Sequence, residues 1–274
     1  MTLILEGKTV RERIIEQLKQ KIENFSSKPT LAIIQIGDNE ESGVYIRQKQ
    51  IFGEKIGAVV RHIKSKADKP QEQIIEEIRN LNTDENVHGI IVQLPLLKGF
   101  DENEIIQTIV PSKDVDGLTS TTNFMPATTR GILNLLNYYK INPVGKNVVV
   151  MGRSKLVGKP TAEALLNLGA KVTVAHSQTE NIREVTKQAE ILVVAIGKPK
   201  LVDPSYIREG QVVIDVGINV SQDKEGKKVL CGDVNYEDVK EIVSAITPVP
   251  GGVGLMTVCA LFENLIEAYA RRSS

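Results

Sequence analysis

The segment from Asn147 to Leu165 reads NVVVMGRSKLVGKPTAEAL and constrains the fold more than any other part of the chain. Its three consecutive valines predict a short strand that is covered on both faces of a parallel sheet. Gly152, Ser154 and Gly158 then occupy a turn, and an amphipathic helix follows it. A buried strand that runs through a glycine turn into a helix is typical of α/β proteins.

The same turn indicates a nucleotide site. Glycine backbone can approach a pyrophosphate closely, and amides at the start of a helix favour its negative charge. The spacing G-x-S-x-x-x-G departs from the standard G-x-G-x-x-G, so an ordinary strand-turn-helix junction is a competing interpretation. The next strand ends at His176 and Ser177, where an NAD-specific site usually carries Asp or Glu, and Arg153 follows the first glycine. A cation and a hydroxyl suit a 2′-phosphate, so the local chemistry predicts NADP.

Strands and helices alternate along the chain, which predicts an α/β fold. Turn-rich passages at 113–126 and 247–254 bracket the nucleotide motif. We expect two domains that flank a cleft: an N-terminal α/β domain, residues 1–137 plus 251–274, and a Rossmann-like domain, residues 138–250. The last helix would then return to the first domain. Strands are expected at Leu31–Ile36, Ala58–Ile63, Gly89–Leu94, Val148–Met151, Val172–Ala175, Ile191–Ala195 and Val212–Val216. Helices are expected at about Val10–Glu23, Val44–Ile56, Gln71–Asn80, Thr129–Tyr139, Lys159–Asn167 and Met256–Ala270.

Composition excludes several classes of function. The 274 residues include 34 basic and 34 acidic side chains, and a formal net charge of zero gives no sign of a nucleic-acid or anionic-membrane partner. The N-terminus lacks the apolar core of a signal peptide, and no apolar run approaches the roughly 20 residues that span a bilayer. Cys231 and Cys259 lack metal-ligand spacing and sit in apolar stretches, as reduced cysteines of a cytoplasmic protein would.

Two segments in the N-terminal half carry candidate proton-transfer and binding residues. Tyr45 and Lys49 are spaced to share one helix face, and a lysine removed from water can move protons near neutral pH. The alternative is a half-buried tyrosine beside a solvated lysine. Gln93 ends an apolar strand, where open α/β sheets place their ligands, and a plain polar strand end is the competing interpretation.

Two turn-rich segments complete the set. Asp114 and Asp116 in KDVDGL could form a simple turn or face a nitrogen-rich ring, and no partner cluster supports a metal. The segment PVPGGVGLMT, which contains Gly252, could be a rigid turn before a helix or a loop that lines the cofactor end of a cleft.

In this order and spacing, the segments resemble the bifunctional methylenetetrahydrofolate dehydrogenase/methenyltetrahydrofolate cyclohydrolase family. The resemblance runs over nearly the whole chain and rests on several motifs together. These are SGVYIRQKQ, VQLPLL, KDVDGL, VVVMGRSKLVGKP, VIDVGIN, GDV and ITPVPGGVGLMT. It implies NADP-linked oxidation of 5,10-methylenetetrahydrofolate, hydrolysis of the methenyl product to 10-formyltetrahydrofolate, and a homodimer formed through the nucleotide-binding domain. It also implies a place in one-carbon metabolism, which feeds purine biosynthesis.

The resemblance also implies a role for each matching residue. Lys49 would transfer protons in the cyclohydrolase step, Gln93 would hydrogen-bond it, Tyr45 would pack on the folate ring, and Asp116 would anchor the pterin edge. Arg153 and Ser177 would hold the 2′-phosphate of NADP. The remaining positions would line the cofactor or the adjoining folate site; they are Gly152, Ser154, Ile218 and Gly252.

Several positions depart from the family pattern. Ala127 and Thr129 stand where the family commonly has cysteine and proline, Leu255 replaces a proline, and the loop at 120–125 is short. These changes alter the expected folate cleft without removing a residue that has a chemical role. A monofunctional dehydrogenase therefore remains an alternative, as does a catalytically silent module that binds NADP or folate.

Overall fold

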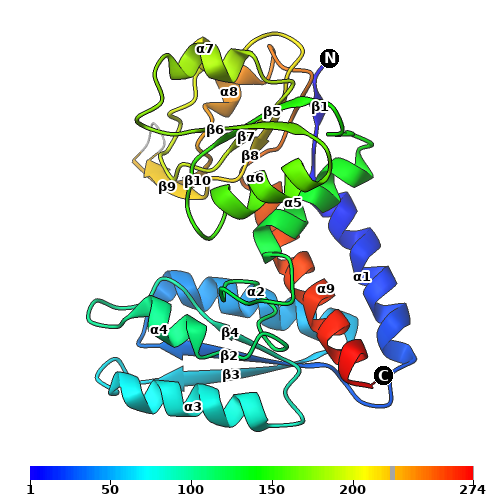
Figure 1. The fold of residues 1–274 in the computed structure, drawn as a ribbon, viewed down its shortest axis with the longest axis vertical. Coiled ribbons are helices and arrows are strands. Elements are labelled where there is room, and N and C mark those ends of the chain that lie inside the picture. Colours follow the sequence, from blue (N-terminus) through cyan, green and yellow to red (C-terminus); the bar gives the residue numbers. More distant parts are fainter. Residues whose placement is uncertain (223–225, 274) are drawn as a thin grey trace. The chain divides into compact units, whose positions relative to one another are not determined.

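The computed structural model describes residues 1–222 and 226–273, which form two compact units. Unit 1 comprises Met1–Arg11 and Thr128–Thr257, and unit 2 comprises Glu12–Ala127 and Val258–Ser274. The helices α1 (Gly7–Glu23) and α9 (Val253–Ser273) each have several residues in both units (Figure 1), and Ala127, the first residue of a third helix, belongs to unit 2.

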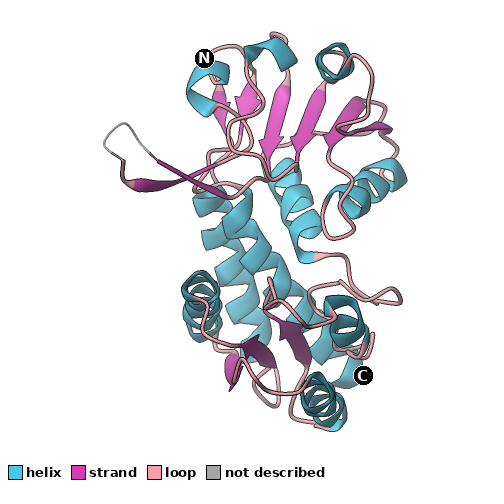
Figure 2. Ribbon diagram, turned by 90° about the vertical axis from the view of Figure 1, so that its left-hand side faces the viewer, coloured by secondary structure: helices cyan, strands magenta, loops and turns pink. Residues whose placement is uncertain are grey.

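Unit 1 is built on a parallel sheet with the strand order β1-β11-β8-β7-β5-β6. Figure 2 shows these strands side by side, with the β9–β10 hairpin extending from them. The strands are β1 (Leu3–Ile4), β5 (Asn147–Met151), β6 (Lys171–Ala175), β7 (Ile191–Val194), β8 (Val212–Asp215) and β11 (Ala245–Ile246), and the hairpin pairs β9 (Asn219–Gln222) with β10 (Lys228–Cys231). Its helices are α5 (Ala127–Tyr138), α6 (Gly158–Asn167), α7 (Ile182–Lys187) and α8 (Tyr236–Val239), with a 3₁₀ turn η1 (Pro204–Tyr206).

The order of strands in unit 1 creates a topological switch point. From β5 the chain adds β6 on one side and then returns to add β7 on the other side of β5. In open parallel sheets, ligands bind outside the carboxyl ends of the strands at this point. The central strands β5 and β7 are buried throughout, apart from Asn147 at the start of β5, so the sheet gives this crevice a firm base.

Unit 2 contains a smaller parallel sheet with the order β3-β2-β4. Its elements are β2 (Thr30–Ile36), α2 (Glu40–Ile56), β3 (Val59–Ser65), α3 (Gln71–Thr83), β4 (Gly89–Val92) and α4 (Glu102–Gln107). All seven residues of β2 are buried, as expected for a central strand with helices on both faces. The helix α9 contributes to this core, where Phe262 stacks on Phe52 with ring centroids 5.0 Å apart.

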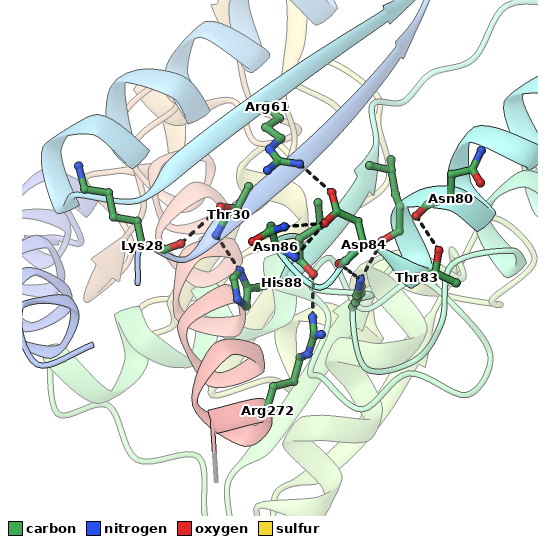
Figure 3. A network of polar contacts seen from close by, with 12 residues as sticks. Lys28, Thr30, Arg61, Asn80, Thr83, Asp84, Asn86, His88 and Arg272 are labelled. Carbon is green, nitrogen blue, oxygen red and sulfur yellow. Dashed lines mark hydrogen bonds and ion pairs between the residues drawn. The ribbon is translucent and has the colours of Figure 1, made fainter. Parts of the chain in front are cut away.

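A polar network ties the amino ends of β2 and β4 to the last turn of α9 (Figure 3). His88 accepts the Thr30 backbone N–H at its Nδ1 at 3.1 Å, and its ring lies against Tyr269 at 4.7 Å between centroids. Arg272 donates to the Val87 carbonyl at 3.0 Å, and Arg61 pairs with Asp84 at 2.8 Å. Because the network is at the amino ends of the strands, it leaves their carboxyl ends available for a site.

The expected strands and helices are present within a few residues of their predicted bounds, and the elements that were missed are short. The N-terminal strand β1 has two residues and pairs with β11, which places residues 1–11 in unit 1 and not with the N-terminal α/β domain. The boundaries therefore differ from the predicted 1–137 plus 251–274 and 138–250. Residues 258–273 of α9 belong to unit 2, as the expected return of the last helix requires.

Helix α9 also reaches the length and apolar composition of a membrane-spanning segment, over Val253–Arg272. Its sequence contains no uninterrupted apolar run of that length, because a few charged residues interrupt the helix. In the structure 61% of the apolar window is buried inside the protein, as in the core helix of a globular domain. Cys231 and Cys259 are both buried, and neither forms a disulfide, as predicted.

Candidate functional site

Lys49 and Gln93 meet at the carboxyl end of the unit 2 sheet. Lys49 lies on α2, and Gln93 immediately follows β4, whose four residues are all buried. The Lys49 Nζ donates to Gln93 Oε1 at 2.8 Å. The Gln93 Nε2 donates to the Leu94 carbonyl at 2.8 Å, which turns the amide oxygen towards the lysine. The structure thus brings together two of the predicted residues in a defined orientation.

The electrostatics of this pair involve Asp116. Burial lowers the pKa of Lys49, and the negative charge of Asp116 partly opposes that shift. Burial raises the pKa of Asp116, Lys49 opposes the change, and the nearby Asp114 carboxylate reinforces it. Both groups are therefore shifted towards their neutral forms, which is the condition in which side chains exchange protons near neutral pH.

The two aspartates of KDVDGL have different environments. Asp114 is fully buried, and its carboxylate accepts hydrogen bonds from the amides of Gly117, Leu118 and Thr119 and from the Thr119 hydroxyl. These bonds shape the turn that carries Asp116, whose side chain is half-buried. Asn264 of α9 braces the same segment by donating to the carbonyl of Val115 at 2.8 Å. The turn interpretation is correct for Asp114, whereas Asp116 is electrostatically coupled to Lys49.

Tyr45 precedes Lys49 by one turn of α2, so the two side chains project from the same side of the helix. Its side chain is 39% exposed, which leaves ring surface to contact a ligand. In the described parts of the chain, no three His, Cys, Asp or Glu side chains are grouped to hold a metal.

In unit 1, the glycine turn lies at the switch point between β5 and β7. Gly152 has a φ of +118°, and a Cβ there would lie 2.0 Å from the Ala195 carbonyl oxygen at the end of β7. A Cβ on Gly158 would lie 2.3 Å from the Gly152 carbonyl oxygen. Ser154 Oγ accepts the amides of Val157 and Gly158 at 3.2 Å each, so this serine binds the backbone where the turn enters α6. These close approaches form the compact backbone turn that a pyrophosphate site needs.

Arg153 and Ser177 lie at the ends of neighbouring strands, β5 and β6. Both side chains are exposed, and Arg153 donates to Gln178 Oε1 at 3.1 Å, which brings it to the turn that contains Ser177. No carboxylate stands at the end of β6, where the sequence reads His176, Ser177 and Gln178. The arrangement keeps the cation and hydroxyl that a 2′-phosphate requires.

Ile218 and Gly252 occupy other parts of unit 1. Ile218 follows β8 and is 44% exposed, whereas Gly252 is buried in the turn before α9. A Cβ on Gly252 would lie 2.6 Å from the Pro248 carbonyl oxygen, so this turn needs a glycine. Both positions belong to the unit that carries the glycine turn, and not to the unit that carries Lys49.

Sequence reasoning missed two buried aspartates in unit 1, Asp215 and Asp233. Their carboxylates bind the backbone of the loops that follow β7 and β8. The signal that could have identified them is an acidic residue at the end of an apolar strand, in VVID, and in the short GDV segment.

Comparisons with known proteins match the chain over nearly its whole length. The model of the tetrahydrofolate dehydrogenase/cyclohydrolase catalytic domain matches residues 5–116, and that of the NAD(P)-binding domain matches residues 126–273. The bifunctional protein FolD of Methanoculleus marisnigri is 45% identical over 280 residues, which cover 99% of this chain and 98% of the relative.

Solved structures agree with these matches. The bifunctional methylenetetrahydrofolate dehydrogenase/cyclohydrolase of Campylobacter jejuni is 37% identical, with a TM-score of 0.94 over 99% of this chain and 100% of that one. The Trypanosoma brucei enzyme, solved with NADP and an inhibitor, is 31% identical, with a TM-score of 0.93 over 99% of this chain and 98% of that one.

Proposed function

The chain belongs to the tetrahydrofolate dehydrogenase/cyclohydrolase family, and we propose that Lys49, oriented by Gln93, is the proton carrier of its hydrolytic reaction. The enzyme oxidises 5,10-methylenetetrahydrofolate with NADP and hydrolyses the methenyl product to 10-formyltetrahydrofolate. The observation that carries the assignment of Lys49 is its 2.8 Å hydrogen bond to Gln93, beside Asp116.

The oxidation depends on the orientation of the bound folate more than on acid–base chemistry. Bound NADP accepts a hydride from the methylene carbon, which becomes a cation delocalised over two folate nitrogens. The protein must hold the folate in one pose, and orientation of this kind accounts for much of an enzyme's rate. Asp116 would accept hydrogen bonds from the pterin edge, and the exposed Tyr45 ring would pack on the folate.

The hydrolysis needs a proton carrier. Water adds to the methenyl carbon and loses one proton, and neutral Lys49 can accept that proton. The adduct then breaks one carbon–nitrogen bond while its hydroxyl becomes the formyl carbonyl and the released nitrogen gains a proton. One proton leaves to solvent overall. Burial favours neutral Lys49, and Gln93 holds the amine without a charge that would raise its pKa again.

Cofactor choice rests on unit 1. The close backbone approaches at Gly152 and Gly158 would receive the pyrophosphate near the start of α6. Arg153 and Ser177 would contact the 2′-phosphate, and Ile218 would line the nicotinamide end. The absence of a carboxylate after β6 in the sequence supports NADP over NAD.

We further propose that the enzyme is a cytoplasmic homodimer that supplies formyl groups, including those for purine biosynthesis. Two features of unit 1 support an interface there. Strand β6 ends the order of the sheet among the described residues, and its Val174 is 40% exposed. Leu166 and Leu168, at and just after the end of α6, are 58% and 45% exposed.

One two-stage assay separates the candidate functions. NADPH formation from methylenetetrahydrofolate reports the dehydrogenase, and decay of methenyltetrahydrofolate absorbance in the absence of cofactor reports the cyclohydrolase. Both signals are expected from one preparation. NADPH formation with no acceleration of methenyl decay would identify a monofunctional dehydrogenase, and ligand binding with neither signal would identify a silent module. Sedimentation of the same preparation tests the dimer.

A further inference from the structure

The loop that follows β7 lies beside the glycine turn at the switch point of unit 1. It comprises residues 196–198 and is called here the β7 loop. It directly follows Ala195, whose carbonyl oxygen lies so near Gly152 that no side chain fits there. A cofactor bound over the glycine turn therefore lies next to the β7 loop.

One carboxylate holds the whole β7 loop. Asp233 Oδ2 accepts the amides of Ile196 at 2.7 Å and Gly197 at 2.9 Å. Asp233 Oδ1 accepts the Lys198 amide at 2.9 Å and Asn219 Nδ2 at 2.8 Å. Each oxygen thus receives two donors, and the residue is fully buried. Four donors on one buried side chain make this a firm attachment.

A second carboxylate holds the backbone that carries Asp233. Asp215, at the end of β8, accepts the amides of Gly217, Asp233 and Val234 at 2.9 to 3.0 Å. A Cβ on Gly232 would lie 1.8 Å from Asp215 Oδ2, and one on Gly217 would lie 2.4 Å from Asp233 Oδ1. The glycines make room for both carboxylates. The ends of β7 and β8 are therefore joined through two aspartates.

Three successive backbone amides that converge on one point form an anion-binding concavity, and such concavities commonly bind phosphate. In this chain Asp233 already occupies the concavity after β7, so the β7 loop is fixed before any ligand arrives. At the start of α6, Ser154 accepts the amides of Val157, Gly158 and Lys159, so the amides that remain for a cofactor phosphate are those of the glycine turn.

We propose that Asp233 is a positioning residue for the nicotinamide cofactor. It holds the β7 loop in the conformation that NADP requires, and it directs the cofactor phosphates to the glycine turn. The inference rests on the proposed function, because it takes NADP as the occupant of the crevice.

The test is Asp233→Asn, assayed for both activities on one preparation. An asparagine places its NH₂ against two donors whichever way it turns, so two of the four bonds are lost and the β7 loop loosens. The KM for NADP should rise by roughly tenfold or more, since small displacements in a binding site have large effects. The cyclohydrolase rate, measured without cofactor, should stay within about twofold, because general acid–base chemistry at Lys49 does not depend on this loop.

Asp203→Asn is the matched control. Asp203 lies in the same unit, and its carboxylate accepts the amide and the hydroxyl of Ser205 and not the amides of the β7 loop. The KM of the Asp203→Asn variant for NADP should equal that of the unmodified protein. Amide hydrogen exchange supplies a readout besides activity: Asp233→Asn should speed exchange at residues 196–198 and leave β5 protected. If Asp233→Asn does not fold, Asn219→Ala removes one donor and keeps the carboxylate, and a smaller rise in KM is expected.

An unchanged KM for NADP in folded Asp233→Asn, or equal losses in both activities, would overturn the proposal. These outcomes leave the proposed function intact, because that function is judged on the unmodified protein. If the unmodified protein forms no NADPH, the proposed function fails, and the role of Asp233 towards NADP fails with it.

Discussion

Lys49 Nζ lies 2.8 Å from Gln93 Oε1, so the buried amine is held by a neutral amide and not by a carboxylate. A carboxylate at this distance would stabilise the ammonium form and raise the pKa of the lysine, whereas burial lowers it. Gln93 can therefore fix the position of the Lys49 amine without raising the pKa of that amine. The charge of Asp116 opposes part of the lowering of the Lys49 pKa that burial causes.

Lys49 should separate the two activities. Lys49→Met keeps much of the aliphatic volume and removes the proton carrier, so cyclohydrolase activity should fall by the order of 10²–10⁴ that acid–base catalysis supplies. Dehydrogenase activity should persist, because hydride transfer needs no proton carrier. Lys49→Arg is the matched variant with a basic side chain that cannot give up its proton, and it should lose hydrolysis equally. Undiminished decay of methenyltetrahydrofolate in either variant would place the proton carrier elsewhere.

Gln93→Glu should move the pH profile of hydrolysis. A carboxylate beside Lys49 raises the pKa of the amine, so the neutral base would predominate only at higher pH. The rising limb of the cyclohydrolase profile should therefore shift to higher pH, while Gln93→Met should lower the rate without that shift. The measurement is the rate of methenyl decay against pH for both variants. Identical profiles for Gln93→Glu and the unmodified enzyme would contradict the role assigned to Gln93.

Asp116→Ala should weaken folate binding and depress both activities, because both reactions use the same bound folate. Asp101→Ala is a suitable control, since Asp101 caps α4 in the same unit by accepting the Glu104 amide at 2.9 Å. Folate titration by fluorescence or calorimetry checks the expectation. A variant that lost only NADP binding would show that Asp116 serves the cofactor.

Arg153→Ala should raise the KM for NADP far more than that for NAD, because only NADP carries the phosphate that the guanidinium would contact. Arg183→Ala is the control: Arg183 lies on α7 over the Tyr206 ring, 5.1 Å from its centroid, and should leave both constants unchanged. Equal affinity of the unmodified protein for the two cofactors would refute the assignment.

Asp215 should make the free energy of unfolding depend on pH. Burial raises the pKa of its carboxyl from 3.8 to about 7 in the folded protein. The folded state therefore keeps a proton that the unfolded chain releases between these values. The resulting stabilisation is complete below about pH 4 and is lost as the pH rises to 7, by on the order of 4 kcal/mol. Urea unfolding measured from pH 4 to 8 should show the free energy of unfolding falling as the pH rises. The Asp215→Asn variant should show a weaker dependence on pH.

The sequence predicted the central strands β5 and β7 well because their apolar runs are nearly continuous. It could not predict β1 and β11, which have two residues each and exist only through pairing with distant partners. The resemblance placed Lys49 beside Gln93, and the structure added the orientation of the amide. The roles of Asp215 and Asp233 could not be predicted, because most of their partners are backbone amides. An amino-acid sequence does not show which backbone amides a carboxylate will bind.

Helix α9 has a consequence for the order in which the protein acquires its structure during synthesis. Its residues from Val258 onwards complete the core of unit 2, where Phe262 stacks on Phe52. The ribosome makes the long second segment of unit 1 between those two phenylalanines. The sheet of unit 2 must therefore wait, with an apolar face uncovered, until the neighbouring unit has been translated. The turn that carries Asp116 also lacks a support until then, because Asn264 of α9 donates to the Val115 carbonyl in that turn.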